Sequence, residues 1–137
     1  MNNSEENILA RDKAIRYIGI SKKTEYEVKK KLKGLKIASS VIDEEIEYLK
    51  ELGYIDDLDY VKSYIRQCEK LQNYSIYEIT NKLLQKGIKT SIMEQEIDVL
   101  KETDYEEKVI GKLIKGKLKS YDEMKQKNYL YRRGFRI

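Results

Sequence analysis

The sequence predicts an all-α protein built from tandem three-helix repeats, and three observations lead to this prediction. The 137 residues include no proline, although average usage would supply about seven in a chain of this length. Apolar residues recur every three or four positions, whereas the strict alternation typical of β-strands is missing. The pattern also repeats along the chain with a period of about 50 residues.

Helical spacing of apolar residues predicts three helices in the first part of the chain, over residues 8–19, 24–35 and 40–52. The second helix opens with Thr24 followed three residues later by Glu27, which is the capping-box pattern. Ser40 with Asp43 is expected to open the third helix, and Gly53 is expected to end it.

Five further helices are predicted from side chains that can cap a helix N-terminus, at Asp56–Asp57, Ser75, Ser91, Asp104 and Ser120. Each of the three serines is followed three residues later by a glutamate, which again predicts a capping box. The last helix is expected to run to about Arg133, just before Gly134.

The repeat divides the chain into units. A shift of 51 residues places Ser75 on Thr24 and Glu78 on Glu27, and a slightly smaller shift places Ile65 on Ile18. The predicted parts are a disordered N-terminal tail over 1–7, three-helix repeats over 8–56 and 57–103, and an incomplete third repeat over 104–137 that lacks its last helix. Stacked repeats of this kind share apolar faces, which predicts an elongated, curved molecule.

The missing last helix has a consequence for the third repeat. Its apolar residues Val109, Leu113, Ile114 and Leu130 would have no third helix to cover them. Burial of one such side chain is worth about 1.5–3 kcal/mol. We therefore expect residues 104–137 to be mobile, or to bury this face against the preceding repeat or a second molecule.

Composition excludes several classes of function. The chain has no histidine and one cysteine, Cys68, so zinc ligation and imidazole chemistry are not expected. No glycine-rich phosphate loop, Ser–His–Asp set or spaced metal-carboxylate signature is present. We therefore predict no catalytic residue, metal site or cofactor. No apolar stretch is long enough for a membrane span or a secretion signal, and the protein is expected in the cytoplasm.

Charge is distributed in blocks. The net charge is +4 overall, but residues 11–36 carry +7, residues 37–59 carry −7 and residues 108–136 carry +8. In the first basic block, one helical stripe is formed by Lys22, Tyr26, Lys29, Lys30 and Lys33. Such a stripe can neutralise phosphates and stack on a base or pack against a partner. The alternative is a solvated, lysine-rich helix face.

The second basic block contributes Lys125, Arg132 and Arg133 as candidate partner or nucleic-acid residues. Guanidinium groups favour phosphate or carboxylate recognition. The alternative is a structural helix end, at which cations offset the helix dipole and Phe135 packs on the core. The sequence leaves both interpretations open.

Four segments, read in order, carry a family resemblance: residues 16–32, 52–57, 78–88 and 129–135. They include the Gly-Tyr-Ile-Asp-Asp stretch that starts at Gly53 and the Arg-Arg-Gly-Phe stretch that ends at Phe135. Together these segments resemble the RecX family of RecA regulators, whose members consist of tandem three-helix repeats. The resemblance covers roughly residues 8–137, and its strength lies in four weak motifs that keep register with an internal repeat.

The resemblance implies a monomeric, non-enzymatic regulator that binds RecA filaments on DNA and inhibits recombinase activity. Weak DNA binding without sequence specificity is expected from the lysine-rich stripes. One alternative is a helix-turn-helix DNA-binding protein of unrelated role. Acids on the third helix oppose groove binding by it, namely Asp43, Glu44, Glu45 and Glu47. Another alternative is an adaptor that contacts no nucleic acid.

Overall fold

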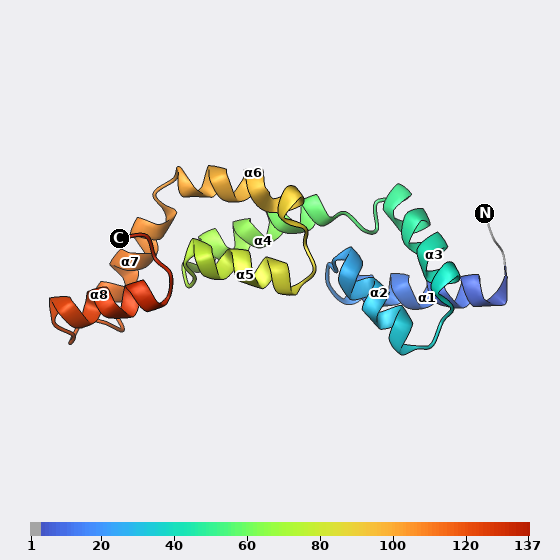
Figure 1. Cartoon of the computed structure of the whole chain (residues 1–137), viewed down its shortest axis with the longest axis horizontal. Helices are drawn as coiled ribbons and strands as arrows, with labels where there is room; N and C mark the ends of the chain where they lie inside the picture. Colours follow the sequence, from blue (N-terminus) through green and yellow to red (C-terminus); the bar gives the residue numbers. More distant parts are fainter. Residues whose placement is uncertain (1–3) are drawn as a thin grey trace. The chain divides into compact units, whose positions relative to one another are not determined.

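The computed structural model describes residues 4–137, and within this range the regular structure is entirely helical. The elements are α1 (Glu5–Ile20), α2 (Glu25–Gly34), α3 (Ser39–Glu51), α4 (Asp57–Leu71), α5 (Ile76–Gln85), α6 (Thr90–Lys101), α7 (Tyr105–Lys115) and α8 (Glu123–Arg132) (Figure 1). The predicted all-α class and its helices grouped in threes, α1–α3 and α4–α6, are confirmed.

The chain divides into two compact units. The first unit holds the described residues up to Tyr60 together with the segment Lys86–Ile88, and the second holds Val61–Gln85 and Lys89–Ile137. In the first unit α1, α2 and α3 pack against one another in all three pairings. The repeat boundaries at residues 56 and 103 stay a prediction, as does the curved stack.

The core of the first unit uses small residues on α1 and large ones on α2 and α3. Ala10 and Ala14 are fully buried, which lets α1 approach the other two helices closely. The facing apolar side chains are Val28, Leu32, Ile42, Ile46 and Leu49. The predicted stripes of α2 and α3 are therefore confirmed for these residues. Ile8 and Leu35, which the same periodicity placed on the apolar faces, are exposed. Ile8 lies off the side of α1 that buries Asn7, Ala10 and Ala14, and Leu35 follows the last residue of α2.

The core of the second unit repeats this scheme with larger residues on its first helix. Val61, Ile65 and Cys68 are buried on α4, as the helical spacing predicts, and Leu58 is exposed. Burial raises the pKa of the Cys68 thiol to about 11. The thiol therefore stays protonated and packs as a small apolar group.

The predicted disordered tail over residues 1–7 is wrong for residues 4–7. Ser4 is the N-cap of α1, and its hydroxyl accepts a hydrogen bond from the Asn7 amide at 3.1 Å. The buried Asn7 side chain in turn donates to Glu45 at 3.2 Å. These bonds hold the first turn of α1 in place. Residues 1–3 lie outside the described part of the chain.

Two of the predicted capping boxes are present. Thr24 and Glu27 exchange hydrogen bonds of 2.9 and 3.1 Å, and Ser75 and Glu78 exchange bonds of the same lengths. Satisfying two orphan amides at a helix start is worth about 1 kcal/mol.

Two predicted capping boxes, at Ser91 and Ser120, and the helix start predicted at Ser40 are wrong. The helices α3 and α6 start at Ser39 and Thr90, so Ser40 and Ser91 already lie in their first turns and cap nothing. Buried isoleucines two residues before each start, Ile37 and Ile88, fix where the chain enters these helices. The cap of α8 is Asp122, two residues after the predicted Ser120.

Residues 104–137 bury their apolar side chains within the second unit. Val109, Leu118, Leu130 and Phe135 are all at most 4% exposed. Val109 and Leu130, two of the residues expected to lack cover, are therefore buried within the second unit. Ile114, by contrast, is 37% exposed.

Candidate functional site

The basic stripe predicted from the sequence lies on α2 and the residues just before it. Val28 and Leu32 point into the core, so the opposite side of the helix faces outward. Lys30 and Lys33 are exposed there, and Lys29 is half-buried. All five predicted stripe residues, from Lys22 to Lys33, belong to the first unit.

Neighbouring acids neutralise part of this stripe. Lys22 pairs with Asp59 at 2.5 Å, and Lys29 pairs with Glu25 at 3.1 Å. Glu25 also binds Lys50 at 2.9 Å. Although burial raises the pKa of Glu25, hydrogen bonds from Lys50 and Lys29 outweigh it and leave that pKa below its ordinary value.

Lys30 and Lys33 are the stripe cations without an ion-pair partner among residues 4–137. They lie three residues apart, so their ammonium groups share one helix face. Of the stripe predicted from the sequence, only Lys30 and Lys33 therefore offer positive charge to a partner. Tyr26 lies one helical turn before Lys30.

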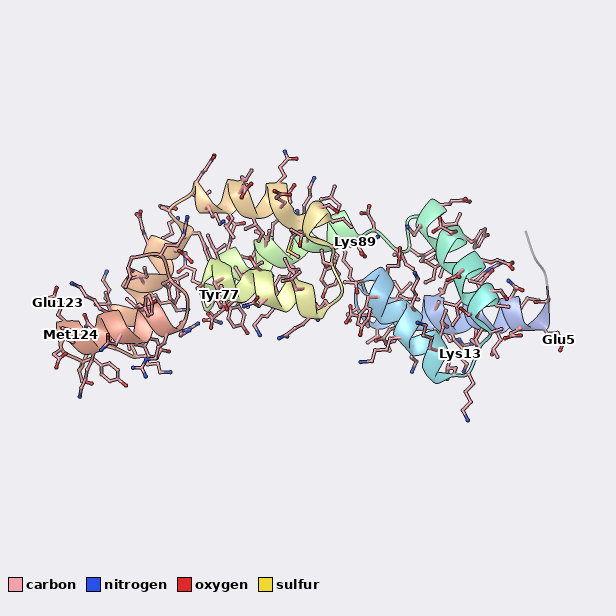
Figure 2. All side chains as sticks on the ribbon, viewed as in Figure 1. Glu5, Lys13, Tyr77, Lys89, Glu123 and Met124 are labelled. Carbon is pink, nitrogen blue, oxygen red and sulfur yellow. The ribbon has the colours of Figure 1, made fainter. Side chains whose placement is uncertain are left out.

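Tyr26 does not stand free on this surface. Its side chain covers Gly87, where a Cβ atom would overlap the Cβ and Cγ of Tyr26. In the second unit Tyr77, labelled in Figure 2, covers Gly134 in the same way, and a Cβ there would lie 2.6 Å from the tyrosine ring. Both glycines have positive φ, 79° and 83°. Only glycine combines that backbone conformation with so close an approach.

The capping residues next to these tyrosines make a second contact. The Thr24 hydroxyl donates to the carbonyl of Lys86 at 2.6 Å, and the Ser75 hydroxyl donates to the carbonyl of Arg133 at 2.7 Å. Both hydroxyl side chains are fully buried. Each hydroxyl thus accepts from its own helix and donates to a residue about 60 positions later, so its single donor is satisfied although the side chain is buried.

A carboxylate completes each site by binding the first amide of the helix. Asp57 accepts from the Glu25 amide at 2.9 Å, and the buried Glu106 accepts from the Ile76 amide at 2.8 Å. We call the two sites the first junction (Thr24–Glu27 with Asp57, Lys86 and Gly87) and the second junction (Ser75–Glu78 with Glu106, Arg133 and Gly134). The first lies within the first unit and the second within the second unit.

Arg133, predicted as a candidate partner-binding residue, is held inside the second junction. Its guanidinium donates to both carboxylate oxygens of Glu78, at 2.7 and 3.1 Å, and to the carbonyl of Asn73 at 2.5 Å. The hydrogen bond to Glu78 raises the pKa of Arg133. The structure therefore favours the structural interpretation of this arginine, and Phe135 beside it is buried.

Acid is expected to weaken the second junction. Burial raises the pKa of Glu78, but hydrogen bonds from Arg133 and Ser75 outweigh it, and the pKa lies below its ordinary 4.5. A group with a lowered folded-state pKa contributes stability above its unfolded pKa and loses it as the pH falls through the folded value. The urea midpoint of the wild-type protein should therefore fall more steeply than that of Glu78→Gln between roughly pH 6 and pH 3. Parallel pH profiles would contradict the expectation.

Lys125 and Arg132 remain on the surface of α8. Both are exposed, and they lie seven residues apart, which places them on one side of the helix. Arg132 makes one weak bond, from Nε to the carbonyl of Asn128 at 3.3 Å. Lys125 forms no ion pair within residues 4–137. Of the three residues predicted from the second basic block, these two therefore stay available to a partner.

The junction residues were not predicted from the sequence, although the repeat contained a signal for them. The pair Lys86-Gly87 and the pair Arg133-Gly134 occupy equivalent positions in their repeats. Each pair contacts an equivalent cap, at Thr24 or Ser75. The repeated cap and the repeated pair that ends in glycine could therefore have been proposed as contact partners from the sequence.

The described residues offer no site for metal chemistry. Within residues 4–137 no group of three or more His, Cys, Asp or Glu side chains is placed to hold a metal ion. None of the helices in this range is both long enough and apolar enough to cross a membrane.

Comparisons with known proteins identify relatives along the whole chain. Residues 10–49 match the family model described as RecX, first three-helix domain. The Regulatory protein RecX of Caldanaerobacter subterraneus subsp. tengcongensis is 32% identical over 130 residues, which cover 93% of this chain and 65% of that protein. The Regulatory protein RecX of Streptococcus agalactiae serotype III is 39% identical over 99 residues, which cover 72% of this chain. The chain spans only 38% of the length of that relative.

The fold has solved counterparts. The crystal structure of RecX from Lactobacillus salivarius superposes with a TM-score of 0.80 at 25% identity, over 96% of this chain and 90% of that one. The matched first domain, the similar relatives and the shared helical fold agree with the resemblance drawn from the four sequence segments. The chain belongs to the RecX family.

Proposed function

We propose that this chain binds RecA filaments assembled on DNA and inhibits them. The similar proteins are named regulatory proteins, which supports a regulatory role. The observation that carries the proposal is the outward face of α2, where Lys30 and Lys33 have no acidic partner among residues 4–137 and lie beside the half-exposed Tyr26. An open, cationic helix face of this kind suits a large acidic surface rather than a small substrate.

RecA-dependent ATP hydrolysis on single-stranded DNA tests this function. We expect hydrolysis to fall when the chain is added at far fewer copies than there are RecA protomers, because one repeat protein can contact several protomers. Filament length, measured by electron microscopy, should fall in parallel. Unchanged hydrolysis and unchanged filament length at stoichiometric addition would exclude the proposed function.

Removing the two free cations should weaken the interaction without unfolding the protein. The double variant Lys30→Gln/Lys33→Gln leaves the core residues Val28 and Leu32 untouched. The wild-type chain alone should bind single-stranded DNA weakly. A plot of log K for this binding against log salt concentration should be less steep for the double variant, by about one unit of slope for each lysine removed. The concentration for half-inhibition of RecA should rise about tenfold, since two charge contacts are lost.

The matched control is Lys13→Gln/Lys70→Gln, which removes the same charge from exposed positions on α1 and α4. It should leave both the salt slope and the inhibition close to wild type. Equal losses for the two double variants would mean that only the net charge matters, and the α2 face would lose its assigned role.

The helix-turn-helix alternative receives little support from α3. Its outward face carries the exposed acids Asp43, Glu44 and Glu47, which phosphates would repel. Tight binding to one duplex sequence that persists at high salt would nevertheless favour that alternative over the proposal.

A further inference from the structure

The first and second junctions share one uncharged framework. The buried cap hydroxyls of Thr24 and Ser75 donate to a backbone carbonyl at 2.6 and 2.7 Å. The first amide of each helix donates to a carboxylate, at 2.9 and 2.8 Å. Tyr26 and Tyr77 each cover a glycine of positive φ. The two junctions therefore differ in their charged groups rather than in their backbone geometry.

Two arginines hold the second junction closed. Arg133 binds both carboxylate oxygens of Glu78, at 2.7 and 3.1 Å. Arg136 binds the buried Glu106 through Nε at 2.9 Å and through its backbone amide at 3.3 Å. Each of these acids thus has an arginine partner, and charge-assisted hydrogen bonds are roughly twice as strong as neutral ones.

A lysine takes the place of the first of these arginines in the first junction. The alignment of the repeats places Lys86 on Arg133. The Lys86 ammonium lies 3.8 Å from Glu27 and also bonds to the Tyr60 hydroxyl. A guanidinium can bind a carboxylate through two parallel bonds, whereas an ammonium is a point charge on a flexible chain. The first junction therefore has one long ion pair where the second has a two-pronged one.

The other acid of the first junction has no ion-pair partner. Asp57 is the counterpart of Glu106, since each accepts from the first amide of its helix. Asp57 is half-buried and forms no ion pair with any residue from 4 to 137. Lys89, which aligns with Arg136, is exposed and is also unpaired within that range. A half-buried carboxylate without a counter-ion opposes closure of the junction that holds it.

We propose that the first junction is a conformational switch, which opens by itself as a minor state while the second junction stays closed. Opening breaks the bond from Thr24 to the Lys86 carbonyl and separates Tyr26 from Gly87. The matched uncharged frameworks give both junctions the same closed geometry. The two arginines keep only the second one in that geometry at all times.

The switch lies beside the helix face proposed to bind RecA. Tyr26 precedes Lys30 by one helical turn, and Lys30 and Lys33 carry the available positive charge of α2. In the closed state 48% of Tyr26 is exposed, and opening adds the part that Gly87 covers. A free ring next to cations can stack on a base. This consequence rests on the proposed function, whereas the opening of the junction does not.

Thiol labelling of the two caps measures how often each junction opens. Thr24 and Ser75 have no exposed surface, so a cysteine in either position reacts with dithionitrobenzoate only while its junction is open. The two proteins are Thr24→Cys and Ser75→Cys, each combined with Cys68→Ala. Relative to its rate in the unfolded chain, Thr24→Cys should react about tenfold faster than Ser75→Cys or more. Its rate should depend little on urea, because local opening exposes little surface.

Amide hydrogen exchange of the wild-type protein gives the same comparison without a substitution. The Glu25 amide binds Asp57 in the first junction, and the Ile76 amide binds Glu106 in the second. Each is the first amide of its helix, so the carboxylate is its partner. We expect the Glu25 amide to exchange about tenfold faster or more, after correction for its intrinsic rate.

Exchanging the two cations tests their role in the switch. Lys86→Arg should slow the labelling of Thr24→Cys about threefold or more, and Arg133→Lys should speed the labelling of Ser75→Cys about tenfold. Both changes keep the net charge. The matched control is Arg132→Lys, at the exposed neighbouring position, and it should change neither rate.

Three results would overturn the inference, and none of the measurements involves a recombinase. The first is equal labelling of the two caps together with equal exchange of the two amides. The second is a labelling rate of Thr24→Cys that rises with urea as steeply as global unfolding, because the cap would then be reached only in the unfolded protein. The third is that exchanging the cations leaves both labelling rates unchanged.

Discussion

Replacing Gly87 by alanine is expected to lower the free energy of unfolding by about 2–4 kcal/mol, through backbone strain and overpacking. The residue has φ of 79°, and an added Cβ would overlap the side chain of Tyr26. Because the Cβ of Tyr26 itself is involved, rotation of the ring cannot relieve the overlap. Urea unfolding followed by circular dichroism gives the measurement.

Gly53→Ala is the matched control for this substitution. Gly53 has nearly the same φ, 81°, but a Cβ there would meet nothing within 4 Å. Its cost should be that of the left-handed conformation alone, about 1 kcal/mol. If the two substitutions destabilise the protein equally, the contact between Tyr26 and Gly87 contributes nothing and the first junction is only a backbone turn.

Arg133→Ala should destabilise the protein by about 2–3 kcal/mol, whereas Arg132→Ala should change stability by less than about 0.5 kcal/mol. Arg133 binds Glu78 through both carboxylate oxygens and also reaches the carbonyl of Asn73. Its removal leaves a partly buried Glu78 without its cation, which costs more than the contact itself contributes. Arg132 lies exposed one residue away.

The same pair of variants separates stability from partner binding. Arg132→Ala should reduce inhibition of RecA while the urea midpoint stays at the wild-type value. Arg133→Lys keeps the charge but loses the two-pronged geometry, so it should recover only part of the lost stability. A stable Arg133→Ala protein with impaired inhibition would return Arg133 to the partner surface.

Much of the fold could be predicted because helix formation here depends on local signals. The absence of proline, the spacing of Val28 and Leu32 and the capping boxes at Thr24 and Ser75 are properties of short segments, and each is confirmed in the structure. The helix start expected at Ser40 and the capping box expected at Ser91 are wrong because the buried Ile37 and Ile88, a tertiary effect, start those helices earlier.

The candidate site could be predicted only in part, because charge pattern does not reveal pairing. Lys30 and Lys33 lie on the outward face as their spacing requires. Lys22, in contrast, has an acidic partner 37 residues away, and Arg133 has one 55 residues away. Tyr26 was assigned outward from its place on the helix, but the glycine that it covers is brought to it by a later repeat. Such long-range contacts are invisible to any window of neighbouring residues.

The span of the first junction has a consequence for synthesis of the protein on the ribosome. The Thr24 hydroxyl finds its acceptor at Lys86, 62 residues later, although every helix of the first unit has been made well before that point. Ribosomes add about 5–20 residues per second, so several seconds pass between the synthesis of α3 and that of the segment that contacts Thr24. During this interval the first unit has all the residues of its core cluster, up to Ile55, but lacks the contacts with Lys86 and Gly87. Completion of the first unit is thereby tied to translation of α4 and α5, which are made before Lys86.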